Sequence, residues 1–227
     1  MKAVTFSYDD GVTQDKRLIE LLNKYSLKAT FNINSELLGT QNELVGPNFR
    51  VNHNKNFPSE VKEIYKGHEV AVHTLTHPNL TALDDAEVIR QVENDRKNLS
   101  KLVGYDVATM AYPCGGTNND DRVAGLIAEN TGVKFSRTIT STYSFDMQDN
   151  LYRYNPTVYH LEWDKMFSLA EEFITLTPET PKVFYIWGHS YEFDIENTWD
   201  KFEEFCKLIS GKNDIFYGTN REIFFEK

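Results

Sequence analysis

The chain has 227 residues, a formal net charge of −10 and a hydrophobic fraction of 40%. This length is enough for one sizeable core, so we expect one domain over residues 1–227. The negative charge, which no cluster of Lys and Arg offsets, argues against nucleic acid and anionic membrane surfaces as partners.

Short runs rich in β-branched and aromatic residues recur along the chain and are typical of buried parallel strands. They lie at residues 3–8, 28–34, 68–73, 107–112, 133–139 and 182–188. Apolar residues with a helical period lie between or after these runs, near residues 18–22, 61–64, 88–102, 123–127, 167–174 and 199–209. The alternation predicts an α/β fold with a parallel sheet, either open or closed into a barrel.

Residues 39–58 form a segment without a clear period that is longer than most connections between a strand and a helix. The segment follows the second predicted strand, on the side where the carboxyl ends of the strands meet. Two interpretations stay open, a loop that lines a substrate site and a plain insertion.

Polar side chains follow several of the predicted strands: Asp9 and Asp10 after the first, His73 and His77 after the third, and His189 after the last. Functional groups gather at this end of parallel strands. Neutral imidazole and carboxylate are ligands for a divalent ion such as Zn²⁺. With a cation on one of the adjacent aspartates, the other is free to accept a proton from water. The residues alone therefore indicate a metal-assisted hydrolytic site.

Four stretches in this order, "TFSYDDG", "HTLTHP", "YPCGG" and "IWGHS", resemble the polysaccharide deacetylase family, carbohydrate esterase family 4. The resemblance runs from Lys2 to about residue 190 and implies an irregular (β/α) barrel. It also implies removal of acetyl groups from N-acetylated sugars by a metal-dependent hydrolase. The metal expected is zinc, with cobalt, nickel or manganese as alternatives.

The same resemblance implies a role for each polar residue. Asp9 is the expected catalytic base and His189 the expected general acid. The metal ligands that it implies are Asp10, His73 and His77.

The third stretch departs from the family pattern, because Ala111 stands where the family has an arginine that holds the base. Arg137, at the end of the next predicted strand, is the candidate replacement that orients Asp9, and a structural ion pair is the alternative. Cys114 occupies the place of a family tyrosine whose backbone N–H binds the oxyanion, a role that survives a change of side chain. We expect no nucleophilic role for Cys114, since no histidine is predicted beside it.

Tyr112 and Trp187 are the remaining candidates for substrate binding, and a core position is the alternative for Trp187. Several carboxylates are candidates for orienting His189: Asp146, Asp149, Asp164, Glu192 and Asp194. We expect His68 to be structural and His53 and His160 to be solvated loop residues, with substrate contact as the alternative.

Three other functions stay open: an O-acetyl esterase on acetylated glycans, a hydrolase of small C–N compounds, and a carbohydrate-binding protein without catalysis. Met1 and Lys2 lead directly into the first predicted strand, and the chain has no run of 18 apolar residues. We therefore expect a cytoplasmic protein, or a secreted one if a leader has been removed. The sequence does not indicate the oligomeric state.

Overall fold

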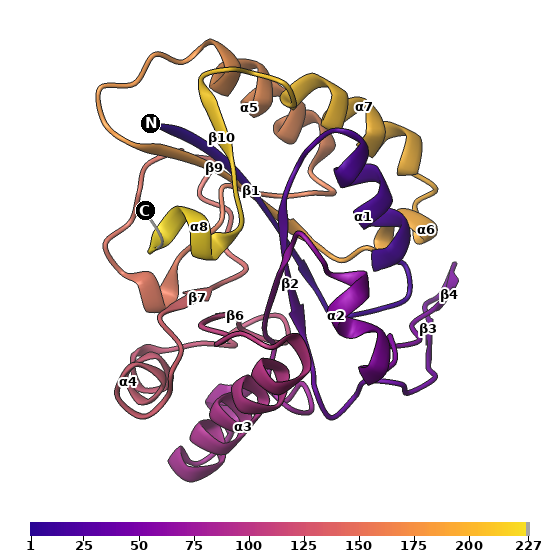
Figure 1. The fold of residues 1–227 in the computed structure, drawn as a ribbon, viewed down its shortest axis with the longest axis vertical. Helices are drawn as coiled ribbons and strands as arrows, with labels where there is room; N and C mark the ends of the chain where they lie inside the picture. The colour runs from indigo at the N-terminus through magenta and orange to yellow at the C-terminus, as the bar shows by residue number, and fades with distance from the viewer. Residues whose placement is uncertain (226–227) are drawn as a thin grey trace.

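The computed structural model describes residues 1–225. Among these residues, eight parallel strands form one curled sheet in the order β7-β6-β5-β2-β1-β9-β8, with β10 also paired to β1. The longer helices pack on the outer side of the sheet (Figure 1). The strands are β1 (Lys2–Asp9), β2 (Ala29–Ile33), β5 (Glu69–Val72), β6 (Thr109–Ala111), β7 (Phe135–Arg137), β8 (Val158–Tyr159), β9 (Lys182–Gly188) and β10 (Ile215–Tyr217). The predicted α/β barrel is therefore confirmed.

All six predicted strands are present among the described residues, although several are shorter than predicted. Two further strands of the parallel sheet, β8 and β10, were not predicted. β8 and β10 have only two and three residues, too few to show a period. β10 pairs with the first half of β1, from Lys2 to Val4, and β2 pairs with the second half, from Phe6 to Asp9. The first three residues of β1 are thus hydrogen-bonded, on the edge that β2 also uses, to a strand at residues 215–217, far along the chain.

The gap between β7 and β9 is bridged by residues 154–159. Tyr154 donates its N–H to Ser136 O in β7 at 2.9 Å, and Thr157 donates to Tyr185 O in β9 at 2.9 Å. One end of the segment is therefore hydrogen-bonded to β7 and the other end to β9. The barrel is closed by this irregular segment and not by direct pairing of the two strands.

The six predicted helices are confirmed, and two short ones, α6 and α8, were not predicted. The helices are α1 (Asp15–Lys24), α2 (Val61–Ile64), α3 (Asp85–Val103), α4 (Asp121–Asn130), α5 (Trp163–Thr175), α6 (Glu192–Ile195), α7 (Trp199–Ile209) and α8 (Asn220–Phe224). The longest, α3, has signals at both ends. Asp84 caps it by accepting the N–H of Glu87 at 2.8 Å, and Gly104 ends it with φ of 84°.

β1 divides its side chains between the two faces of the sheet, because successive residues of a strand point to opposite sides. Val4, Phe6 and Tyr8 belong to the main core that the helices cover. Ser7 and Asp9 point into the barrel, where both contact Arg137. The carboxyl end of β1 therefore carries its first aspartate inside the barrel.

The barrel interior beneath Asp9 contains a layer of hydrogen-bonded polar groups beside an apolar cluster. Glu69 accepts hydrogen bonds from Thr30 at 2.8 Å and from Thr109, and burial raises the pKa of its carboxyl. Asn220, at the start of α8, accepts from Thr5 at 3.2 Å. Buried polar groups that are hydrogen-bonded avoid most of the desolvation cost, so this layer supports the site above it.

Residues 39–58 contain an antiparallel hairpin, β3 (Glu43–Val45) and β4 (Arg50–Asn52), which projects from the body (Figure 1). No regular structure was expected in this segment from the sequence, and the hairpin was missed. Each of its strands has only three residues, which is too few to show a period. After the hairpin, the chain around Lys55 runs antiparallel to residues 11–13, and Lys55 forms a β-bridge with Val12. This pairing places part of the insertion beside the end of β1.

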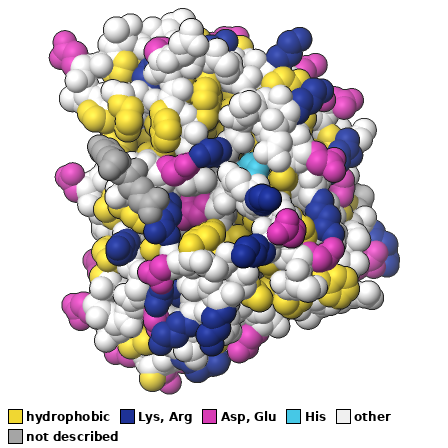
Figure 2. All heavy atoms as spheres, viewed as in Figure 1, with side chains coloured by type: hydrophobic (Ala, Val, Ile, Leu, Met, Phe, Trp, Pro, Cys, Tyr) yellow, Lys and Arg dark blue, Asp and Glu magenta, His cyan; other side chains and the backbone are white. Residues whose placement is uncertain are grey.

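The surface shown in Figure 2 has basic and acidic side chains interspersed, and only a small area of histidine is visible on it. Within residues 1–225, no helix combines the length and the apolar character that crossing a membrane requires.

We predict that Gly11→Ala destabilises the fold more than Gly211→Ala does. Both glycines have positive φ, 65° and 68°, so an alanine at either position strains the backbone by about 1–3 kcal/mol. A Cβ at Gly11 would also lie 2.8 Å from Ile33 Cγ2, whereas nothing lies within 4 Å at Gly211. Crowding of this kind costs about 1–3 kcal/mol more. Urea unfolding measures both losses, and equal losses would contradict the steric part.

Candidate active site

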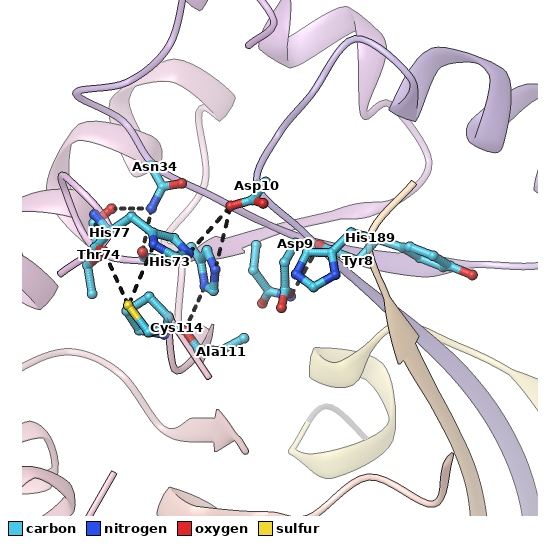
Figure 3. Close-up of polar contacts among 12 residues, drawn as sticks. Tyr8, Asp9, Asp10, Asn34, His73, Thr74, His77, Ala111, Cys114 and His189 are labelled. Atoms are coloured by element: carbon cyan, nitrogen blue, oxygen red, sulfur yellow. Dashed lines mark hydrogen bonds and ion pairs between the residues drawn. The ribbon is translucent and has the colours of Figure 1, made fainter. Parts of the chain in front are cut away.

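The three predicted metal ligands come together at the carboxyl ends of β1 and β5 (Figure 3). Asp10, His73 and His77 each offer a ligand atom, and these atoms lie within 4.8 Å of one another. Asp10 Oδ1 is 3.9 Å from His73 Nε2 and 3.6 Å from His77 Nε2. Asp10 has φ of 86° and His77 has φ of 62°, in the left-handed region that few non-glycine residues adopt.

The second nitrogen of each imidazole faces a separate partner. His73 Nδ1 donates to Ala111 O at 2.9 Å, and His77 Nδ1 lies 3.8 Å from Cys114 Sγ. Such partners fix the tautomer that leaves Nε2 free for a cation. Burial lowers the pKa of His73 to about 4, so this ring is neutral at pH 7, the form that binds metal. These residues fit a divalent cation.

Asp9 is paired with Arg137 inside the barrel. The Nη2 atom of Arg137 contacts both carboxylate oxygens of Asp9, at 2.6 Å for Oδ2, and Arg137 is fully buried. Asn32 Nδ2 donates to Asp9 Oδ1 at 2.8 Å, a contact that sequence reasoning missed. Burial is the largest influence on the pKa of Asp9 and would raise it. The charges of Arg137, His73 and His189, with the hydrogen bond from Arg137, together outweigh burial and hold this pKa below its ordinary value.

Arg137 also uses its other nitrogens. Nε donates to Ser7 Oγ at 3.0 Å and Nη1 to Thr138 O at 3.0 Å, while the guanidinium lies 4.7 Å from the ring centre of Trp187. A guanidinium held on several sides has one orientation, so Arg137 presents the same edge to Asp9.

His189 is oriented by Glu192, three residues further along the chain. Glu192 Oε2 lies 3.1 Å from His189 Nδ1 and accepts the His189 backbone N–H at 3.0 Å. Burial lowers the pKa of His189, but the charge and hydrogen bond of Glu192, with Asp10 and Asp9, raise it to about 9. The imidazole is therefore protonated at neutral pH.

The other candidate carboxylates are engaged elsewhere or exposed. Asp146 pairs with Lys182, and Asp194 accepts the indole N–H of Trp199 at 2.7 Å. The remaining two, Asp149 and Asp164, are exposed.

His160 was expected to be solvated, and this expectation was wrong. His160 is fully buried, and its Nε2 lies 2.7 Å from Glu192 Oε2. The position is available because residue 188 is glycine, where a Cβ would lie 2.3 Å from the His160 ring. Glu192 is thus held between two imidazoles.

His53 was also expected in solvent, and the structure places it against the site instead. It is 9% exposed, and its Nε2 lies 3.2 Å from Asp10 Oδ2. His68 has a structural contact, since its Nδ1 accepts the N–H of Ala29 at 3.1 Å at the opposite end of the barrel.

Eight of the nine predicted site residues line one cavity of 260 Å³, and the ninth, Arg137, lies behind Asp9. Figure 3 shows Asp9 between the Asp10 group and His189. Tyr191 and Ile139 also line the cavity and were not predicted. The arrangement brings a carboxylate, a protonated imidazole and a candidate cation site to one space.

Cys114 sits at a tight turn in the cavity wall, with φ of 69° and its carbonyl held by Asn118 Nδ2 at 2.8 Å. The expectation that no histidine lies beside it was wrong, because His77 does. Burial and Asp10 raise the pKa of the Cys114 thiol, however, so it stays protonated and is a poor nucleophile.

The two aromatic candidates form walls of the cavity. Tyr112 donates its hydroxyl to Tyr152 O at 2.6 Å and its N–H to Arg137 O at 3.0 Å, so its ring is what faces the cavity. Trp187 is only 8% exposed and packs on Tyr159, with ring centres 4.8 Å apart. Trp187 therefore combines a core position with a place in the wall.

Comparisons with known proteins agree with one another. The family model for polysaccharide deacetylase matches residues 1–135. A peptidoglycan N-acetylglucosamine deacetylase of Listeria monocytogenes is 28% identical over 155 residues, which cover 67% of this chain and 28% of that protein. The chain thus spans less than a third of that relative's length.

Two solved structures resemble the fold over most of both chains. A polysaccharide deacetylase from Bacillus cereus has a TM-score of 0.57 at 17% identity and covers 98% of this chain and 93% of its own. A family 4 carbohydrate esterase from Streptomyces lividans, solved in complex with acetate, has a TM-score of 0.56 at 15% identity and covers 91% and 87%.

We predict that Arg137→Met lowers the free energy of unfolding by about 3–5 kcal/mol, because it leaves the buried carboxylate of Asp9 without its cation. Urea unfolding at pH 7 measures the loss. Arg153→Met is the matched control, since its pair with Asp121 is exposed and contributes about 1 kcal/mol or less. The double variant Asp9→Asn/Arg137→Met should recover part of the loss, and additive losses would refute the pairing.

We also predict that Glu192→Gln lowers the pKa of His189 from about 9 toward its ordinary value. The change removes the largest influence that favours the charged imidazole, while burial, which opposes it, and the smaller influences of Asp10 and Asp9 remain. Titration of the His189 ring protons by NMR measures the shift. Asp194→Asn, which removes a neighbouring carboxylate bound to Trp199, is the control and should leave this pKa within about half a unit.

Proposed function

Because the chain belongs to the polysaccharide deacetylase family, we propose that it is a metal-dependent hydrolase that removes acetyl groups from N-acetylated sugars. One observation carries the proposal: Asp9, paired with Arg137, and His189, paired with Glu192, line the same cavity as the Asp10–His73–His77 group. A carboxylate that can accept a proton and an imidazolium that can donate one are the pair that amide hydrolysis needs.

In the proposed reaction, water adds to the acetyl carbonyl, the C–N bond breaks, and acetate and an amine are released. Asp9 accepts the proton of the attacking water, and Arg137 keeps this carboxylate ionised and oriented. His189, charged through Glu192, donates its proton to the departing amine. The backbone N–H of Cys114 donates to the oxyanion, which requires no particular side chain.

Asp10, His73 and His77 would hold the metal in this proposal. A bound divalent ion would polarise the carbonyl and make water a better nucleophile. Zinc is the ion proposed, because imidazole and carboxylate are its common ligands, and cobalt, nickel or manganese are the alternatives. The proposed substrate is an acetylated oligosaccharide or polysaccharide.

We expect the purified protein to bind one divalent ion and to release acetate from N-acetylglucosamine oligomers, and a chelator to abolish the release. Asp9→Asn should lower kcat by about 10²- to 10⁴-fold, because it removes the proton acceptor. Asp149→Asn, an exposed carboxylate, is the control and should leave kcat unchanged. Metal analysis and an acetate assay make both measurements.

The outcomes separate the alternatives. Acetate release from acetylated xylan alone would favour an O-acetyl esterase, and turnover of small amides alone would favour a hydrolase of C–N compounds outside sugars. A protein that binds metal and turns over neither class would be a binding protein. Full activity of Asp9→Asn would refute the proposed mechanism.

A further inference from the structure

The insertion at residues 39–58 brings two basic side chains to the carboxylate of Asp10. His53 Nε2 lies 3.2 Å from Oδ2, and Lys55 Nζ lies 3.5 Å from Oδ1. Lys55 is only 6% exposed, which is rare for lysine and requires a charged partner. The proposed reaction uses neither residue.

Both side chains are held there by backbone pairing. The returning chain runs antiparallel to residues 11–13: Lys55 bridges Val12, and Thr13 donates its N–H to Asn54 O at 2.9 Å. His53 and Lys55 are two residues apart in this extended stretch, so both face Asp10. The ring of His53 also packs on Tyr191, with ring centres 4.9 Å apart.

The two carboxylate oxygens of Asp10 have different neighbours. Oδ1 faces the Nε2 atoms of His73 and His77, at 3.9 and 3.6 Å, and also Lys55. Oδ2 faces His53. A cation bound between the two imidazoles would therefore use the oxygen that the ammonium of Lys55 also approaches. His53 restrains the carboxylate from its other side and leaves Oδ1 free.

We propose that His53 and Lys55 set the metal affinity of this site in opposite directions. His53 is a positioning residue that turns Oδ1 toward the imidazoles and strengthens binding. Lys55 places a positive charge beside the ion and weakens binding, while in the metal-free protein it compensates the buried charge of Asp10. The inference rests on the proposed metal site, and it makes the insertion a part of that site.

The charge of Lys55 has two coupled consequences. Without a metal, removing the ammonium leaves the Asp10 carboxylate buried and less compensated, which destabilises the fold. With a metal, removing it takes away a repulsion between a monovalent and a divalent cation at short range. The same substitution should therefore lower the melting temperature of the metal-free protein and tighten metal binding.

The test measures the Kd for Zn²⁺ and Co²⁺ by competition with a chelator, and the Tm with and without metal. We expect Lys55→Met and Lys55→Gln to lower Kd at least tenfold and to lower the Tm of the metal-free protein. Lys55→Arg, which keeps the charge, should stay within about threefold of the wild-type Kd. Lys66→Met, the removal of an exposed charge, is the matched control and should change neither quantity.

For the second residue, His53→Ala should raise Kd by about 10- to 100-fold, the usual effect of losing a partner of a metal ligand. His53→Gln, which keeps a donor, should recover part of this loss. Because both readouts are independent of turnover, they test these residues whatever the substrate.

Three results would overturn the inference. A Kd that is unchanged or higher in both neutral Lys55 variants would show that the ammonium does not oppose the ion. An unchanged Kd in His53→Ala would show that His53 does not position Asp10. A wild-type protein that binds no divalent ion would overturn the proposed function together with this inference, whereas the first two results leave that function intact.

Discussion

The contact between Arg137 and Asp9 is the constraint on which the rest of the site depends. A guanidinium with no exposed surface must find acceptors inside the barrel, and it finds them in Asp9, Ser7 and the carbonyl of Thr138. These contacts join the ends of β1 and β7, which lie on opposite sides of the interior. The indole of Trp187 packs on the guanidinium, while Asp9 remains open to the cavity.

The other charged groups of the site follow the same rule, in that each has an opposite charge or a donor at short range. His189 has Glu192, and Asp10 has His53 and Lys55. A buried charge that lost its partner would either unfold the region or change its protonation state. The site is therefore a set of coupled pairs, and a change at one residue is expected to alter the behaviour of its neighbour.

Sequence reasoning reached the parts of the site that follow from strand ends. The proximity of Asp10 and His73 could be predicted because the carboxyl ends of parallel strands lie at the same end of the barrel. The proximity of Arg137 to Asp9 could be predicted in the same way. Which of the five candidate carboxylates orients His189 could not be predicted. The position of Glu192 depends on the conformation of the turn after β9, and a turn has no periodic pattern in the sequence. The position of His53 was missed because it follows a hairpin whose strands have only three residues each. The segment that contains it is placed by pairing with residues 11–13, which are distant in the sequence.

The pairing of β10 with β1 has a consequence for how the molecule folds. Lys2 is the partner of Ile215, so the first strand completes its hydrogen bonding only when a segment from the far end of the chain arrives. Contacts of such high sequence separation are slow to form, because a long loop must close before they stabilise the chain. During synthesis the first strand would emerge long before this partner, so we expect the pairing of β10 with β1 to be a late step of folding.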